Sequence, residues 1–330
     1  MLVVGANAAG KTNLLESLHV GTQGFSPRTR SDTSLIRFGQ DTARVSLRGE
    51  RDGSRLELSV VLQANVAKRA SLNGARLDAA ELLRREVATL VFTPDRLVVV
   101  KGGPAARRAY FDRTLARGWP AKAALPAEYG RALAQRNASL RGLSAGFSSA
   151  EALTPWTERV AELGRKLTAA RRDVIAALEP ALDLRGSELG LPMLALRYEP
   201  EELTAATLEA RLDRDLDRGA TGVGPHLDEI EILAGGRDIR TFGSQGEQRL
   251  AVLALLLAEA ELTQERQGFA PLLLLDDVLS ELDPERRRIL AVRLRSFGQT
   301  LITTTSAAAL PEEPDQMVEV EATPSGTVAR

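Results

Sequence analysis

The chain has 330 residues, of which 44% are hydrophobic and 26% are charged, with 43 Lys and Arg against 44 Asp and Glu. This length allows two domains or one large domain with an inserted lobe, and the hydrophobic fraction is sufficient for a sizeable core. Cysteine is absent and the only histidines are His19 and His226, which excludes disulfides and thiolate metal sites and argues against a His-rich metal site or a His-based triad.

The sequence shows no signal for a membrane. No segment reaches the roughly 18 uncharged apolar residues of a membrane span. The apolar start Leu2–Val4 enters a Gly-rich loop at once and has no basic region before it, so it does not resemble a signal peptide. We therefore expect a soluble, cytoplasmic globular protein.

The first hundred residues predict a mixture of strands and one helix. The apolar run at 2–4 predicts a strand, and a helix follows from about Lys11 to Val20. Residues 43–49 and 56–62 alternate apolar and polar and predict a hairpin with its turn at Arg51–Ser54. A third strand leads through 70–72 into the turn Asn73-Gly74, and the apolar runs 88–92 and 97–100 predict two buried strands.

The rest of the chain changes from helical back to mixed character. Predicted helices cover 104–117, 126–142 and 149–179, the last ending at Pro180, and a strand at 193–198 and a helix at 201–218 follow. Strands at 230–233, 272–275 and 300–304 then alternate with helices at 246–266 and 284–296. This order predicts one α/β lobe, formed by 1–103 and 219–330, that is split by a mainly helical lobe at 104–218. The two ends of the chain must then meet in space.

The Gly-rich loop after the first strand matches the P-loop pattern G-x-x-x-x-G-K-[ST] without a mismatch. Small residues allow the backbone N–H groups to surround phosphates at the positive end of a helix. Lys11 would contact the β- and γ-phosphates, and the Thr12 hydroxyl would ligate Mg²⁺. The predicted ATP-binding residues are Gly5, Ala6, Asn7, Ala8, Ala9, Gly10, Lys11, Thr12 and Asn13.

A second acidic motif follows the apolar strand that begins at Pro271. Asp276 and Asp277 end this strand in the Walker B pattern, which predicts that Asp276 holds Mg²⁺ and that Asp277 polarises the attacking water. Lys11 and Asp277 are therefore the catalytic candidates. Ser280–Asp283 comes next, immediately before Pro284. It is interpreted either as a helix cap or as the D-loop of ABC ATPases, with Ser280 and Asp283 as its polar residues, and the two interpretations are compatible.

Residues 243–249 precede a long apolar helix and resemble the ABC signature, with Ser244, Gly246 and Gln248 as its characteristic residues. A Ser hydroxyl and a Gly backbone at a helix N-terminus are suited to an anion. In ABC proteins this motif reaches the nucleotide of a second subunit, so the resemblance implies an ATP-bound homodimer. The switch position falls near 303–305, where either a Thr hydroxyl contacts the γ-phosphate or the β-branched residues end a strand.

The combination of motifs resembles the RecF family of SMC-like ATPases over nearly the whole chain. Family-like stretches beyond the ABC motifs are Ser26–Ile36 with Arg28 and Arg30, Thr93–Asp112, Gln135–Ala138, and Gly224–His226 with Asp228. The resemblance implies an ABC-type P-loop ATPase head, ATP and Mg²⁺ as ligands, ATP-dependent dimers and slow hydrolysis. It also implies binding to DNA at gaps or junctions, and action with RecO and RecR to place RecA on single strands.

The basic segment 101–172, with 14 Lys and Arg and 5 Asp and Glu, is interpreted either as solvated Arg-rich helices or as a phosphate-binding face. With the family resemblance it becomes a candidate DNA surface that includes Arg107, Arg108, Arg136 and Arg141. Two features depart from the family. Members carry about two strands before the P-loop, which are either truncated or absent here, and Glu247 stands where many relatives have Gln.

Three alternatives belong to other functional classes. An ABC transporter ATPase would lack this Arg-rich lobe and would need a membrane partner. A structural SMC-like protein would need long coiled-coil arms, for which the sequence has no heptad run. A P-loop small-molecule kinase would not need the motifs at 244–248 and 280–283. His226 has two interpretations, a structural turn residue or a residue near the nucleotide.

Overall fold

The computed structural model describes residues 1–29, 31–51, 53–323 and 326–330. Arg30 of the Arg-rich segment and Asp52 of the predicted hairpin turn lie outside the described residues. The chain divides into two compact units: unit 1 contains residues 1–96 and 263–330, and unit 2 contains residues 97–262. Among the described residues, no helix combines the length and the apolar character that crossing a membrane requires.

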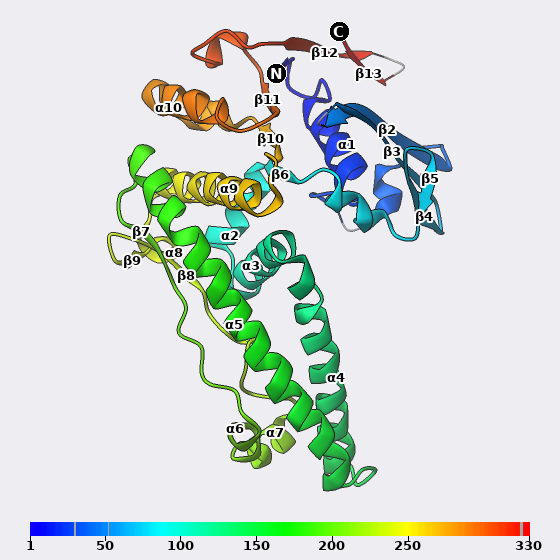
Figure 1. Ribbon diagram of the computed structural model, residues 1–330, viewed down its shortest axis with the longest axis vertical. Helices are drawn as coiled ribbons and strands as arrows, with labels where there is room; N and C mark the ends of the chain where they lie inside the picture. The colour runs from blue at the N-terminus through cyan, green and yellow to red at the C-terminus, as the bar shows by residue number, and fades with distance from the viewer. Residues whose placement is uncertain (30, 52, 324–325) are drawn as a thin grey trace. The chain divides into compact units, whose positions relative to one another are not determined.

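Unit 1 contains a six-stranded mixed sheet in the order β13-β12-β1-β11-β10-β6 (Figure 1). Its strands are β1 (Leu2–Val4), β6 (Thr89–Phe92), β10 (Leu272–Asp276), β11 (Thr300–Thr304), β12 (Met317–Thr323) and β13 (Gly326–Ala329). All neighbouring strands are parallel except β12 and β13. Because β1 lies between β11 and β12, the two ends of the chain form one sheet, which confirms that prediction.

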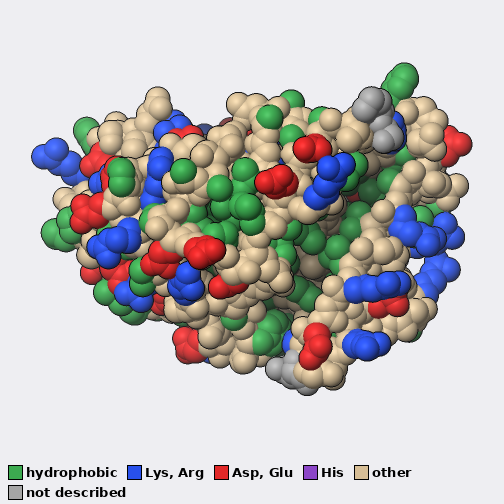
Figure 2. All heavy atoms as spheres, turned by 90° about the horizontal axis from the view of Figure 1, so that it is seen from above, with side chains coloured by type: hydrophobic (Ala, Val, Ile, Leu, Met, Phe, Trp, Pro, Cys, Tyr) green, Lys and Arg blue, Asp and Glu red, His purple; other side chains and the backbone are tan. Residues whose placement is uncertain are grey.

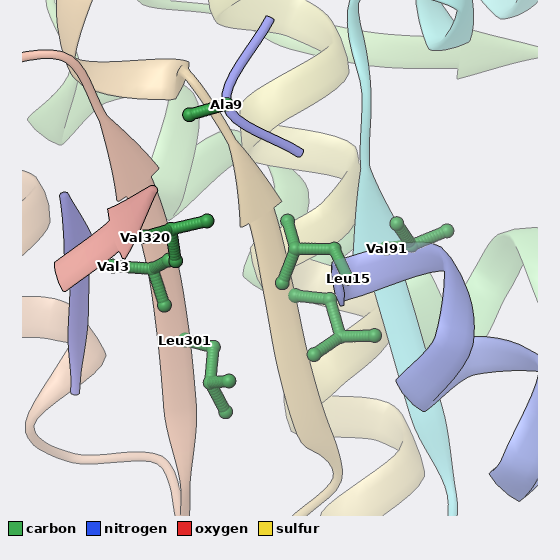
Figure 3. Close-up of a cluster of buried hydrophobic side chains, with 7 residues drawn as sticks. Val3, Ala9, Leu15, Val91, Leu301 and Val320 are labelled. Carbon is green, nitrogen blue, oxygen red and sulfur yellow. The ribbon is translucent and has the colours of Figure 1, made fainter. Parts of the chain in front are cut away.

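The core of this sheet consists of aliphatic side chains from distant parts of the chain. Val3, Leu274 and Leu301 come from three different strands and are at most 5% exposed. Figure 3 shows Val3 and Val320 close together with Leu301 near them, and Leu15 of α1 (Lys11–Gln23) near Val91. Parallel strands are buried on both faces, which explains why β10 reads as an unbroken apolar run. The helix α10 (Pro284–Leu294) also flanks the sheet.

A second sheet in unit 1 is antiparallel and consists of β2 (Thr42–Arg51), β3 (Ser54–Gln63), β4 (Val66–Leu72) and β5 (Ala75–Leu77). Its inner face carries Leu58, Val60 and Leu62, which pack with Val20 of α1 and with η2 (Ala80–Arg85). Its outer face is polar, as expected for an antiparallel sheet with one solvated side. The 3-10 turns η1 (Asp32–Leu35) and η3 (Pro94–Leu97) complete this part of the chain.

Unit 2 is mainly helical. Figure 1 shows its longest helices, α4 (Leu125–Ser144) and α5 (Ala150–Glu188), side by side, and the short loop between them makes them antiparallel. The shorter elements are α2 (Val98–Lys101), α3 (Pro104–Gly118), η4 (Pro120–Lys122), α6 (Ala205–Glu209), α7 (Leu212–Arg218), α8 (Ile239–Phe242), and a sheet of β7 (Leu194–Arg197), β8 (Glu231–Ala234) and β9 (Arg237–Asp238). The helix α9 (Gln245–Gln267) begins in this unit, and its last turn belongs to unit 1.

Four predictions of local structure were wrong. The run 97–100 is helical rather than a strand: Val99 and Val100 are buried while Val98 is 53% exposed, so the three valines do not share one environment. Pro180 does not end its helix but lies inside α5, where the buried Leu178 and Leu182 outweigh the cost of a proline. The predicted helix 201–218 is two short helices, and β12 and β13 were not predicted.

Candidate nucleotide-binding site

The P-loop adopts a backbone that few residues accept. Gly10 has φ +101° and Ala8 has φ +65°. A Cβ on Gly10 would lie 2.1 Å from the Thr327 hydroxyl, so only glycine fits there. Lys11 begins α1, and its buried ammonium donates to the carbonyl oxygens of Gly5 (2.8 Å) and Ala6 (2.9 Å). The first N–H groups of the helix and this ammonium thus converge at one end of α1.

The two acids at the end of β10 have different surroundings. Asp276 is 7% exposed, and its carboxylate accepts from the Thr12 hydroxyl at 3.1 Å (Oδ1) and 2.9 Å (Oδ2). It also accepts from the Thr303 hydroxyl at 2.7 Å. Asp277 has a left-handed backbone, φ +51°, and its Oδ1 is buried without a hydrogen-bond partner in the described part of the chain. The structure therefore brings together the predicted P-loop and Walker B residues.

A pocket of about 340 Å³ lies between these two motifs. Its wall combines two cationic side chains, a hydroxyl and two carboxylates. The hydroxyl and the carboxylates suit a hydrated Mg²⁺, and the cations suit the phosphates that accompany it. Asp277 lines the same pocket, and its buried Oδ1 has no hydrogen-bond partner among the described residues. A buried oxygen of this kind needs a partner such as water. The lining residues are Asn7, Ala8, Gly10, Lys11, Thr12, Asn13, Arg28, Pro94, Asp276 and Asp277.

Arg28 and Pro94 were not predicted as residues of this pocket. Arg28 is 43% exposed at its side chain and lies 3.3 Å from Glu16 Oε2, while its backbone N–H donates to the Ser26 hydroxyl. Only the resemblance of the Ser26–Ile36 segment pointed to Arg28, without a role. Arg28 lies between α1 and η1, and Pro94 begins η3 after β6. Both reach the P-loop only through the tertiary arrangement of unit 1, which local sequence patterns do not encode.

The Ser280–Asp283 segment has the geometry of a helix start. Asp283 is the N-cap of α10 and accepts from the backbone N–H of Arg286 at 2.9 Å, with Pro284 at the first helical position. This confirms the cap interpretation. Ser280 lies in η5 (Val278–Glu281) and donates to the Asp277 carbonyl at 2.9 Å. The exposed Ser280 hydroxyl is thereby hydrogen-bonded to the backbone of Asp277.

The signature-like residues begin α9 in unit 2. Ser244 and Gly246 are exposed. Glu247 accepts from the Ser244 N–H at 2.7 Å, and its own N–H donates to the Ser244 hydroxyl at 3.2 Å, a reciprocal pair of capping-box type. These bonds hold the pKa of the Glu247 carboxyl below its ordinary value. Gln248 is buried and donates to the carbonyls of Ile239 (3.1 Å) and Arg240 (3.3 Å), so its amide fixes α8 and is not available to a ligand.

The four candidate DNA contacts are not equivalent. Arg107 is 4% exposed and donates to Glu229 at 2.7 Å, and Arg136 is 1% exposed and donates to Asp215 at 2.8 Å. Neither guanidinium is accessible to a phosphate, so we correct the prediction for these two residues: they form internal ion pairs. Arg108 is half-buried and donates to the Asp228 carbonyl at 2.6 Å. Arg141 is exposed and donates to the Gly219 carbonyl at 3.3 Å.

His226 has partners at both ring nitrogens within unit 2. Nδ1 accepts from the Tyr129 hydroxyl at 2.8 Å, and Nε2 donates to the Thr221 carbonyl at 3.1 Å. Burial lowers the pKa of His226 and keeps the ring neutral, which is the protonation state these two bonds require. The geometry therefore agrees with the structural interpretation of this residue.

Comparisons with known proteins give one consistent answer. The model of the RecF/RecN/SMC N-terminal domain matches residues 1–329. The DNA replication and repair protein RecF of Heliobacterium modesticaldum is 36% identical over 94% of this chain and 88% of its own length. That of Geobacillus thermodenitrificans is 35% identical over 99% of this chain and 92% of its own length. These matches do not favour the transporter ATPase alternative.

Solved structures agree with the sequence relatives. A RecF structure with ATP, described as that of a recombination mediator protein in the RecFOR pathway, is 28% identical, has a TM-score of 0.87 and covers all of this chain and 91% of its own. The Smc head domain of Pyrococcus furiosus is 18% identical with a TM-score of 0.57 and shares the fold. The fold is thus that of an ABC-type ATPase head with a helical lobe, and the chain belongs to the RecF family.

Proposed function

We propose that this protein is an ATP-dependent DNA-binding protein of recombinational repair and replication restart, which acts in the cytoplasm. Its partners would be DNA at single-strand gaps or junctions and the RecO and RecR mediators, with RecA loading as the outcome. The observation that carries this proposal is the pocket of unit 1, in which the P-loop ammonium, the Thr12 hydroxyl and the Asp276 carboxylate converge. The names of the relatives, a DNA replication and repair protein and a recombination mediator, support the biological process.

ATP would occupy this pocket with its phosphates against the start of α1. Lys11 is held by two carbonyl oxygens, and exchanging them for phosphate oxygens places a cation on the β- and γ-phosphates. Thr12 and Asp276 would hold Mg²⁺, which when bound neutralises phosphate charge. The Asp277 carboxylate would orient and polarise the attacking water. We expect slow hydrolysis that acts as a switch for dimerisation.

The second half of the ATP site would come from another copy of the chain. Ser244 and Gly246 are exposed at the N-terminus of α9, where a hydroxyl and backbone N–H groups are suited to a γ-phosphate. The two hydrogen bonds between Glu247 and Ser244 hold Ser244 in place. They also direct the Glu247 carboxylate, which many relatives replace with a neutral Gln, towards the backbone N–H of Ser244. Ser280 and Asp283 would lie at the interface of the ATP-bound homodimer.

The DNA surface proposed from the structure is the outer face of the β2–β5 sheet rather than Arg107 and Arg136. Strand register places Arg44 opposite Val61 and Val61 opposite Arg69. The next row along the strands contains Ser46, Ser59, Ser71 and Arg76. Residues paired in this way point to the same face. Figure 2 shows Lys and Arg side chains gathered where these strands lie.

The charges of this face favour phosphate. It carries Arg44, Arg48, Arg55, Arg69 and Arg76 against Glu50 and Glu57, and Glu57 is paired with Arg48 at 3.5 Å. Arg44 and Arg69 are exposed on either side of Val61, about 10 Å apart given the usual spacing of strands. Serine hydroxyls between arginines are typical of contacts to the sugar-phosphate backbone, which position a duplex without reading its sequence.

The test measures the affinity for a gapped duplex by fluorescence anisotropy, with and without Mg·ATP, at several salt concentrations. We expect ATP-dependent binding that weakens with salt, and a log–log salt slope reduced by about 2 in the double variant Arg44→Glu/Arg69→Glu. The matched variant Arg141→Glu, in unit 2, should leave the slope unchanged. A loss confined to Arg141→Glu would move the DNA surface to unit 2. Absence of ATP-dependent DNA binding would refute the repair function.

A further inference from the structure

A single buried hydroxyl connects the two acids of the nucleotide pocket. Thr303 lies on β11, opposite Asp276 in the parallel pairing of β10 and β11, and is fully buried. Its Oγ1 donates to Asp276 Oδ1 at 2.7 Å and accepts from the backbone N–H of Asp277 at 3.0 Å. A threonine hydroxyl has one proton, so donation to Asp276 leaves it only as an acceptor for other groups. It therefore has no proton left to donate to a phosphate oxygen.

The bond to Asp276 fixes the direction of that carboxylate. Asp276 Oδ1 accepts from the Thr303 hydroxyl and from the Thr12 hydroxyl at 3.1 Å, while Oδ2 accepts from the Thr12 hydroxyl at 2.9 Å. When Thr12 turns to a metal ion, Thr303 remains as the group that holds the carboxylate plane. The β-branched side chain is itself restricted to few rotamers, and full burial restricts it further.

The bond to Asp277 supports a strained backbone. Asp277 is not glycine, yet its φ of +51° is left-handed, a conformation that is strained for a residue with a Cβ. The N–H that Thr303 accepts belongs to this same residue. The turn places the Asp277 side chain at the pocket, where its Oδ1 is buried without a partner among the described residues.

We propose that Thr303 is a positioning residue for the Mg²⁺-nucleotide site. It orients Asp276 through its side chain and Asp277 through its backbone, and so couples the last parallel strand to both acids. This role differs from a direct contact between Thr303 and the γ-phosphate, because Thr303 already donates its hydroxyl proton to Asp276. It rests on the proposed binding of ATP and Mg²⁺ in this pocket.

The neighbouring Thr304 provides a matched control. It is also buried, at 2% exposed, and lies on the same strand, but its hydroxyl donates to the Ser306 carbonyl at 3.2 Å instead of an acid. Replacing either threonine with valine keeps the shape and removes one hydroxyl. A general loss of β11 stability would affect both variants, whereas a loss of acid positioning would affect only the variant at 303.

The experiment measures ATP affinity by titration calorimetry on the full chain, with Mg²⁺ and with EDTA, for wild type, Thr303→Val, Thr303→Ser and Thr304→Val. Thermal unfolding verifies that each variant is folded. We expect Thr303→Val to bind metal-free ATP with an affinity within about twofold of wild type. The factor by which Mg²⁺ raises the ATP affinity should be smaller than in wild type by about tenfold or more, because a hydrogen bond to a charged group is lost. Thr303→Ser should restore the Mg²⁺ effect, and Thr304→Val should retain it.

A folded Thr303→Val with the wild-type Mg²⁺ effect would overturn the proposal, and so would a Thr303→Ser variant as defective as Thr303→Val. If Thr303→Val does not fold, Thr303→Ala supplies the hydroxyl-free variant, and the same two outcomes decide. A wild-type chain that binds no ATP under either condition contradicts the proposed function itself. That outcome is distinguishable because it does not depend on any substitution.

Discussion

The internal ion pair between Arg136 and Asp215 permits a quantitative prediction. Arg136 is 1% exposed and its Nη1 lies 2.8 Å from Asp215 Oδ2 and 2.6 Å from the Thr221 hydroxyl. The variant Arg136→Met removes the charge and retains most of the volume. Asp215 then stays buried, and among the described residues its remaining side-chain partner is the Gly222 N–H, which donates to Oδ1 at 2.9 Å. Removal of one partner of a buried pair costs about 3–5 kcal/mol.

That cost is a large part of the 5–15 kcal/mol by which a domain is typically stable. Urea unfolding followed by circular dichroism measures it, and the double variant Arg136→Met/Asp215→Leu should recover much of the loss, because no unpaired charge remains. DNA affinity of folded Arg136→Met should equal that of wild type. A variant destabilised by less than about 1 kcal/mol that binds DNA more weakly would show that Arg136 is a phosphate contact and that our correction is mistaken.

Three further predictions concern Lys11, His226 and Glu247. Lys11→Ala should abolish ATP binding in calorimetry while thermal unfolding stays close to wild type, and retained affinity would contradict the P-loop assignment. Burial lowers the pKa of folded His226, so the unfolded chain takes up this proton more readily and stability falls as the pH drops below about 6.5. When the pH is lowered from about 7.5 to about 5.5, the urea concentration at the midpoint of unfolding should decrease, and it should decrease less in His226→Gln. Equal decreases in the two proteins would exclude His226 as the cause. Glu247→Gln can keep the bond from the Ser244 N–H and should change stability by less than about 0.5 kcal/mol, whereas Glu247→Ala should cost about 1 kcal/mol; similar stabilities would argue against the capping pair.

The sequence predicted the fold well where local rules act without competition. The P-loop helix begins at Lys11 and β11 covers 300–304, as expected from a glycine-ended loop and a β-branched run. Prediction failed where tertiary packing outweighs local preference. Pro180 lies in the interior of a helix whose neighbouring leucines are buried, and β12 depends on a distant partner, β1, for its hydrogen bonds. Pairing between strands that are distant in the sequence cannot be predicted from a short stretch of residues.

The same distinction applies to the site. Lys11, Thr12 and Asp276 belong to motifs whose spacing reflects their chemistry, and the structure brings them together in one pocket. The Arg candidates were chosen from the charge of segment 101–172 together with the family resemblance. Neither distinguishes a solvated guanidinium from one that is paired inside a helical lobe. Arg136 was misassigned for this reason. Thr303 could not be assigned its partners before the register between β10 and β11 was known.

The central claim is that ATP is bound between the P-loop of one copy and the signature of another, and a mixing experiment tests it most directly. Lys11→Ala retains the signature, and Ser244→Arg retains the P-loop. Each variant alone should remain monomeric with Mg·ATP in sedimentation velocity, whereas wild type should dimerise. An equimolar mixture contains one intact composite site per pair, so we predict an ATP-dependent heterodimer. A mixture as monomeric as its components, or Ser244→Arg alone dimerising like wild type, would contradict the composite site.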